Sequence, residues 1–443
     1  MMLKRYFIFL LLSSVFSAAT AEDIRLAKLS DIPQIKNNPL SFSVPVIDTS
    51  IFKKLEKRLR VYPKDHEAEL LKSILFFRAG KLDLALKELD SLIKKVPDFN
   101  LAYLLKGDLL SSKFVANNHL GQTTVLASLI PELNNEQQQQ LRFLREEADL
   151  RLQALINTKK HNTLPRQILS LAPSVKKALL IDKKANRLYI FSRQASGQLK
   201  EEVNDYYVTT GKLVGDKLVK GDLRTPEGVY FVTSWISPDK LPDKYGIGAF
   251  PVNYPNELDK HNGKTGYGIW LHGTDKGSYS RPPRDSEGCV VLTNIDLEVL
   301  KKEIVPGVTP VVITDSVEWI DYVSWKQEQQ EIMQAIEKWR FDWESMNVDN
   351  YLSNYDKGFW SASHNFKSWS ARKRNLARNK TFQSVDVSDI SVLLYPKNKK
   401  INEQLAVVRL QQDYKSNNFK SEMSKRLYLR KTKKEWKIIY EGR

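Results

Sequence analysis

Hydrophobic positions follow three different patterns along the chain, and each pattern predicts its own kind of folded region. Between residues 50 and 160, apolar side chains recur at helical spacing, as at Leu82, Leu86 and Leu89. Residues 175–315 instead carry short apolar runs rich in β-branched and aromatic residues, separated by Gly, Pro and Asp turns, which predict strands. Residues 325–443 begin with a long helical pattern and continue with four strand candidates. The expected fold is therefore multidomain α+β, with a helical module, a mostly-β sandwich or barrel, and a C-terminal α+β domain.

The helical module carries a repeat signal. Pro63, Pro97 and Pro131 are each 34 residues apart, Gly80 interrupts the helical pattern as a turn, and Ala85 falls where two packed helices need a small residue. In these features the module resembles the tetratricopeptide repeat, a helical hairpin of that period. Two units are fewer than such stacks usually need, so an irregular helical bundle with coincidental prolines is the alternative.

The N-terminus predicts export. Residues 1–21 open with a basic pair, continue with a nearly wholly apolar run from Phe7 to Phe16, and end in Ala19-Thr20-Ala21, which fits the small-x-small rule of signal peptidase. The apolar run is shorter than the roughly 18–20 residues that span a bilayer, so cleavage after Ala21 is favoured over retention as an anchor. We expect a periplasmic or cell-envelope protein that meets the membrane only transiently, with residues 22–49 as a linker.

Composition limits the class of partner. Of 443 residues, 42% are hydrophobic and 27% charged, which excludes a wholly disordered or collagen-like chain. The net charge is +17, and residues 325–443 hold 24 basic against 14 acidic residues, so most of the excess lies in the tail. Such charge favours anionic partners, but export argues against nucleic acid. We therefore predict that residues 325–443 contact anionic glycan or an envelope protein.

The single cysteine is the centre of the candidate chemistry. One Cys excludes a disulfide framework, and with scattered histidines it gives no metal-ligand cluster, so neither metal nor cofactor is expected. Cys289 follows Gly288, which allows a tight turn and leaves an amide free to face a substrate oxygen. A nucleophilic thiol needs a base, and His272, at the end of an apolar strand and followed by Gly, is the best placed. We predict Cys289 as nucleophile, His272 as general acid/base and the Gly288 backbone as an oxyanion donor.

Three ordered motifs carry a family resemblance. They are Thr210-Gly-Lys followed by Gly221-Asp-Leu-Arg-Thr-Pro226-Glu-Gly-Val-Tyr-Phe, then His272-Gly-Thr, then Ser286-Glu-Gly-Cys289. In these motifs residues 175–315 resemble the L,D-transpeptidase (YkuD-type) catalytic domain of bacterial cell-wall enzymes. The resemblance implies a Cys thioester formed on tetrapeptide stems of peptidoglycan with loss of D-alanine.

The same resemblance suggests further roles. It implies that the Ser286 carbonyl orients His272 and that Gly273 and Thr274 border the substrate. Arg281 and Arg284 flank the loop between the motifs and could grip stem carboxylates, although solvated loop charge is the plainer interpretation.

Two departures and the tail leave the reaction outcome open. Val291 stands where many relatives have Arg or Asn, and Glu287 where many have His. The order of Gln412–Ser416 and Trp436 resembles the final hairpin of the nuclear-transport-factor-like cone. Together these features resemble a cell-shape subgroup that includes L,D-carboxypeptidases. We expect an L,D-transpeptidase, with an L,D-carboxypeptidase as the alternative and a non-enzymatic envelope-binding scaffold as the second.

Overall fold

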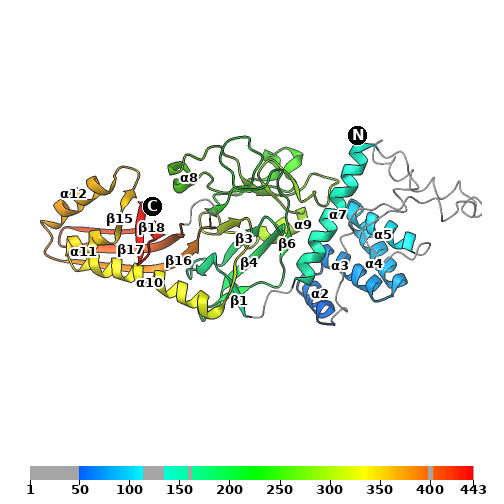
Figure 1. The fold of residues 1–443 in the computed structure, drawn as a ribbon, viewed down its shortest axis with the longest axis horizontal. Coiled ribbons are helices and arrows are strands. Elements are labelled where there is room, and N and C mark those ends of the chain that lie inside the picture. The colour runs from blue at the N-terminus through cyan, green and yellow to red at the C-terminus, as the bar shows by residue number, and fades with distance from the viewer. Residues whose placement is uncertain (1–48, 113–133, 158–161, 398–402, 443) are drawn as a thin grey trace, which may run out of the picture. The chain divides into compact units, whose positions relative to one another are not determined.

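The computed structural model describes residues 49–112, 134–157, 162–397 and 403–442 (Figure 1). The expected signal peptide, all but the last residue of the expected linker, and Pro131 lie outside these ranges. Of the helices within them, none is long and apolar enough to cross a membrane.

The first region is helical, as predicted. Its helices are α2 (Thr49–Val61), α3 (His66–Arg78), α4 (Leu82–Lys95), α5 (Asn100–Ser112) and α7 (Asn135–Ile156). Gly80 takes φ +72°, a conformation that favours glycine, and so makes the expected turn between α3 and α4. Ala85 is fully buried on α4 within the apolar core of these helices. The tetratricopeptide assignment stays a prediction, because the third proline and residues 113–133 of the second unit lie outside the described residues.

The second region is a β sandwich. Its larger sheet has the order β5-β4-β3-β13-β8, and its smaller sheet the order β12-β10-β9. Their bounds are β3 (Lys177–Asp182), β4 (Arg187–Arg193), β5 (Leu199–Glu201), β8 (Gly228–Phe231), β9 (Ala249–Pro251), β10 (Trp270–His272), β12 (Val290–Val291) and β13 (Pro310–Thr314). Leu179 of β3 shares one core with Leu271 and Val290 of the smaller sheet, whereas Leu180 turns to the other face. Burial on both faces explains why β3 and β4 read as continuous apolar runs.

The third region is a helix-covered cone whose sheet is antiparallel except for the parallel pair β15 and β19. Its elements are α10 (Tyr322–Glu344), α11 (Val348–Ser353), β15 (Tyr355–Trp360), α12 (Phe366–Ala377), β16 (Gln383–Leu394), β17 (Leu405–Ser416), β18 (Phe419–Lys431) and β19 (Trp436–Gly442). Alternate residues of β17 face opposite cores: Val408 packs with α10 on one side, and Val407 packs with the β sandwich on the other. The single long helical pattern over 326–355 is in fact two helices, because Asn347 caps α11 and Met346 takes φ +61°.

A strand from outside the third region completes its sheet. The sheet order is β15-β19-β18-β17-β16-β2, where β2 (Ile168–Ser170) precedes the β sandwich in sequence. Ile168 pairs with Leu393 of β16, and its carbonyl accepts a bond from the Trp325 indole at 2.9 Å. Backbone hydrogen bonds between β2 and β16 thus connect the sandwich to the cone.

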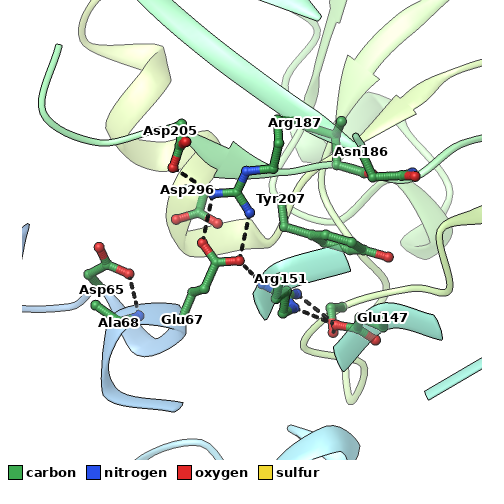
Figure 2. A network of polar contacts seen from close by, with 12 residues as sticks. Asp65, Glu67, Ala68, Glu147, Arg151, Asn186, Arg187, Asp205, Tyr207 and Asp296 are labelled. Atoms are coloured by element: carbon green, nitrogen blue, oxygen red, sulfur yellow. Dashed lines mark hydrogen bonds and ion pairs between the residues drawn. The ribbon is translucent and has the colours of Figure 1, made fainter. Parts of the chain in front are cut away.

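A buried charge cluster joins the helices to the sandwich (Figure 2). The carboxylate of Glu67 on α3 accepts bonds from Arg58 of α2 at 2.9 Å, Arg151 of α7 at 2.8 Å and Arg187 of β4 at 2.7 and 2.9 Å. Burial opposes ionisation of Glu67, but the charges of Arg187 and Arg151 outweigh it and hold its pKa well below the usual range.

Each of the three guanidinium groups has a second carboxylate. Arg58 binds Asp65 at 2.8 Å, Arg151 binds Glu147 at 2.7 Å, and Arg187 binds Asp205 at 2.6 Å. These partners compensate the charge that Glu67 alone would leave unpaired.

We expect Glu67→Gln to destabilise the folded protein by about 3–5 kcal/mol, because the substitution leaves buried guanidinium groups without their shared counter-charge. The free energy of unfolding, from chemical denaturation followed by far-ultraviolet circular dichroism, measures the loss. Glu88→Gln is the matched control, since Glu88 of α4 pairs with Lys72 at a partly exposed position and its removal should cost below about 1 kcal/mol. Equal losses in the two variants would contradict the role given to the cluster.

Candidate active site

Two neighbouring strands carry the predicted catalytic pair. β10 and β12 run parallel, with Leu271 opposite Val290 and His272 opposite the next residue of β12. Continuing this register places Cys289 opposite Trp270. Leu271 and Val290 point into the sandwich core, so alternation turns His272, Trp270 and Cys289 to the opposite face. The fold thereby brings a histidine and a cysteine 17 positions apart onto one face of adjacent strands.

The thiol of Cys289, which precedes β12, lies next to the backbone that leads into β10. Its Sγ is 3.4 Å from the carbonyl oxygen of Gly268, and the Trp270 amide donates to the sulfur. Burial raises the pKa of Cys289 to about 11, while the Trp270 amide and the charges of Lys244 and Arg281 oppose that rise. The side chain remains partly exposed. At neutral pH the resting group is therefore a protonated thiol that a substrate can reach.

The imidazole of His272 is held as a neutral base. Nδ1 lies 2.7 Å from the carbonyl oxygen of Gly273. A carbonyl can only accept, so Nδ1 carries the proton and Nε2 keeps its lone pair. Burial, together with the charges of Arg281 and Lys244, lowers the pKa of His272 to about 4, although the bond to the Gly273 carbonyl opposes this shift. The ring of Tyr245 packs edge-on against it, with centroids 4.9 Å apart.

The turn before Cys289 is built around Ser286. Its hydroxyl donates to the Cys289 carbonyl at 2.6 Å and accepts from the Gly288 amide at 3.1 Å. Gly288 takes φ +127°, and a Cβ there would lie 2.7 Å from the Arg224 carbonyl oxygen, so only glycine fits.

Two expected contacts differ in the structure. The Gly288 amide, expected to face a substrate oxygen, already donates to the Ser286 hydroxyl. The Ser286 carbonyl accepts from the Lys212 amide at 2.9 Å, and the carbonyl that orients His272 is that of Gly273. The reason is local, because Gly273 directly follows His272 in the chain and its carbonyl oxygen turns toward Nδ1.

Gly273 and Thr274 form a tightly packed turn. A Cβ on Gly273 would lie 2.0 Å from Asn294 Oδ1, which accepts from the Ile247 amide at 3.2 Å. Asn294, the first residue of α9 (Asn294–Lys301), also donates from Nδ2 to the Thr274 carbonyl at 2.9 Å. The Thr274 side chain is buried within this turn, so it does not border an open surface as the resemblance implies.

The two loop arginines have different surroundings. Arg281 donates from Nη2 to the Lys244 carbonyl at 2.9 Å, and its charge acts on both Cys289 and His272. Arg284 pairs with Glu146 of α7 instead. Only Arg281 is therefore brought to the catalytic pair.

Sequence reasoning missed Lys244, Tyr245 and Asn294. Lys244 and Tyr245 lie in a 3-10 turn (Asp243–Tyr245) with no motif of its own, and Asn294 looks like an ordinary helix start. Within the described residues, no group of three or more His, Cys, Asp or Glu side chains is arranged to hold a metal ion.

Comparison with known proteins gives two domain matches. Residues 176–313 match the L,D-transpeptidase catalytic domain (YkuD), and residues 331–442 match the Cds6 C-terminal NTF2-like domain. Among solved structures, Bd1075 of Bdellovibrio bacteriovorus is 32% identical at a TM-score of 0.56, over 63% of this chain and 97% of that one. The chain belongs to the L,D-transpeptidase family. The resemblance seen in the motifs and in the tail is thereby confirmed.

A second relative points to the cell-shape branch of the L,D-transpeptidase family. The helical cell shape determining protein Pgp2 of Campylobacter jejuni is 26% identical at a TM-score of 0.52, over 64% of this chain and 96% of that one. No curated protein matches the chain. Neither domain match includes the helices of residues 49–157.

The raised pKa of Cys289 predicts how the rate of its alkylation by iodoacetamide depends on pH. With a thiol pKa of about 11, the alkylation rate should rise roughly tenfold per pH unit from pH 7 to 10 without a plateau. Arg281→Gln removes a cation that favours the thiolate, so it should raise the thiol pKa and slow alkylation at pH 8 several-fold. Because the chain has one cysteine, the mass of the intact protein reports this site alone.

Arg284→Gln is the control for that measurement. It removes a guanidinium from the same loop, but one that pairs with α7 and does not act on the thiol, so its pH profile should follow the wild type. A rate plateau below pH 9 in the wild type would instead reveal a resting thiolate–imidazolium pair.

Proposed function

We propose that the protein is an exported L,D-transpeptidase that acts on tetrapeptide stems of peptidoglycan through a thioester on Cys289. One observation carries the proposal: a neutral His272, with its Nε2 lone pair free, on the strand next to a partly exposed thiol and on the same face. That pairing is what nucleophilic cysteine catalysis requires.

In the proposed mechanism, proton transfer accompanies attack. The pKa values of about 4 for His272 and about 11 for Cys289 disfavour a resting ion pair. Nε2 therefore takes the thiol proton as Sγ bonds to the carbonyl carbon of the diamino-acid residue. Collapse of the tetrahedral intermediate breaks the bond to the terminal D-alanine nitrogen, which leaves as the amine with the proton that His272 returns.

Charge stabilisation falls to the groups around the pair. Since the Gly288 amide is engaged by Ser286, we assign the oxyanion to the backbone amide of Cys289 itself, and one such donor is worth roughly 2.7–4 kcal/mol. Arg281 and Lys244, whose charges act on both catalytic groups, suit the terminal carboxylate of the stem.

The second candidate is hydrolysis of the same thioester, which makes an L,D-carboxypeptidase. Val291 favours it, because this buried, apolar residue, bonded to Thr209 through both backbone groups at 2.9 Å, offers no side-chain cation where many relatives have Arg or Asn. A missing cation affects the choice of acceptor more than the formation of the thioester. We place the enzyme in the periplasm and, by its likeness to Pgp2, in the maintenance of cell shape.

Purified peptidoglycan sacculi test the reaction. We expect the wild type to remove tetrapeptides and Cys289→Ala to leave them unchanged, with muropeptides identified by mass. Dimers cross-linked between two diamino acids indicate transfer, and tripeptides without such dimers indicate hydrolysis. Identical profiles for the two proteins would support an envelope-binding scaffold in which the thiol has no catalytic role.

The basic tail is proposed to hold an anionic wall polymer. Lys367, Arg372 and Arg378 are exposed on or next to α12. We expect their combined replacement by Gln to reduce binding to sacculi several-fold at 50 mM salt and much less at 500 mM, because screening removes the same attraction. Unchanged retention at both salt concentrations would refute this role. Substitution is preferable to deleting residues 325–443, since deletion would uncover the apolar strand β2.

A further inference from the structure

The loop between the two catalytic motifs enters the core of the helices. Tyr279 is 6% exposed and belongs to the apolar core formed by α2, α3, α4, α5 and α7. Its ring centroid lies 4.2 Å from that of Phe99 and 6.0 Å from that of His66. Its amide donates to the Asp98 carbonyl at 3.3 Å. A residue of the catalytic domain is thus part of the helical core.

The next residue is fixed to the same helices. Ser280 donates from Oγ to Glu147 of α7 at 2.7 Å, and the same oxygen of Glu147 accepts from Arg151. The Arg151 guanidinium in turn lies 4.0 Å from the centroid of the Tyr207 ring. The loop therefore rests on the charge cluster drawn in Figure 2.

The residue after that reaches the catalytic pair. The Arg281 carbonyl accepts bonds from the Tyr207 hydroxyl and the Thr209 hydroxyl, both at 3.0 Å. Its side chain extends to the Lys244 carbonyl. Three consecutive residues thus connect the helical core, α7 and the surroundings of Cys289.

We propose that Tyr279 is a positioning residue, through which the helices of residues 49–157 hold Arg281 beside Cys289 and His272. The importance for turnover rests on the proposed function, but the placement of Arg281 does not. The helices then contribute to catalysis without touching substrate, since losing the anchor frees the loop that carries the cation.

The test combines a core truncation with its conservative counterpart. Tyr279→Ala should slow iodoacetamide alkylation of Cys289 at pH 8 several-fold, as Arg281→Gln does, and raise KM for a tetrapeptide stem about tenfold with a smaller loss in kcat. Tyr279→Phe keeps the ring and should restore both values. In an Arg281→Gln background, Tyr279→Ala should have no further effect on alkylation, because both changes remove the same charge from the site.

Leu89→Ala separates positioning from general weakening of the helices. Leu89 is fully buried in the same core, on α4, and its truncation also leaves a cavity there. We expect it to lower the melting temperature yet leave alkylation at the wild-type rate. Equal slowing by Leu89→Ala and Tyr279→Ala, or no slowing by Tyr279→Ala, would overturn the proposal. If the wild type processed no peptidoglycan, the alkylation result would still decide the placement of Arg281.

Discussion

The arrangement of the helices on the catalytic domain depends on one buried carboxylate. Glu67 is shared by guanidinium groups from α2, α7 and β4, and none of the three can move away without leaving charge unpaired in a dry environment. Apolar packing alone would tolerate small sliding of helices over the sandwich. A carboxylate with three directional partners does not, so it fixes the register in which the catalytic loop meets the helices.

The catalytic strands gain their rigidity from the layer beneath them. The larger sheet of the sandwich packs on the smaller sheet through one face and on the C-terminal cone through the other. β10 and β12 are short, so their positions depend on the core residues Leu271 and Val290 and on the Asn294 contacts that hold the 246–247 and 273–274 turns. Two strands as short as β10 and β12 can hold the site in place because they pack on the buried core of the sandwich.

The sequence predicted most of the fold and singled out the two residues that the structure brings onto one face of adjacent strands, for physical reasons that particular residues make clear. β3, β4 and β13 read as strands because apolar burial on both faces leaves an unbroken run, and Cys289 and His272 stand out because their neighbours Gly288 and Gly273 admit no side chain. The roles of the flanking residues were harder to predict. Which carbonyl bonds to Nδ1, and which amide is already engaged, depends on backbone turns that no spacing reveals.

The contacts that join the regions were not predictable at all. Tyr279 looks like a loop residue, and Glu67 like one more acidic residue of a helix, until distant segments meet them. Lys244 influences the catalytic pair from a turn without a motif, and β2 joins a sheet whose other strands lie far along the chain. Such contacts are long-range, and local patterns carry no information about them.

The pairing of β2 with β16 also constrains the order in which the regions fold during synthesis. Ser170 and Ile390, which are in contact, are 220 positions apart, so β2 leaves the ribosome long before its partner exists. Until then its apolar residues have no sheet to join, and closing so large a loop slows the search for the native pairing. Folding of the C-terminal cone must therefore wait for the whole catalytic domain to emerge, and a chain cut short before β16 would leave β2 without its partner strand.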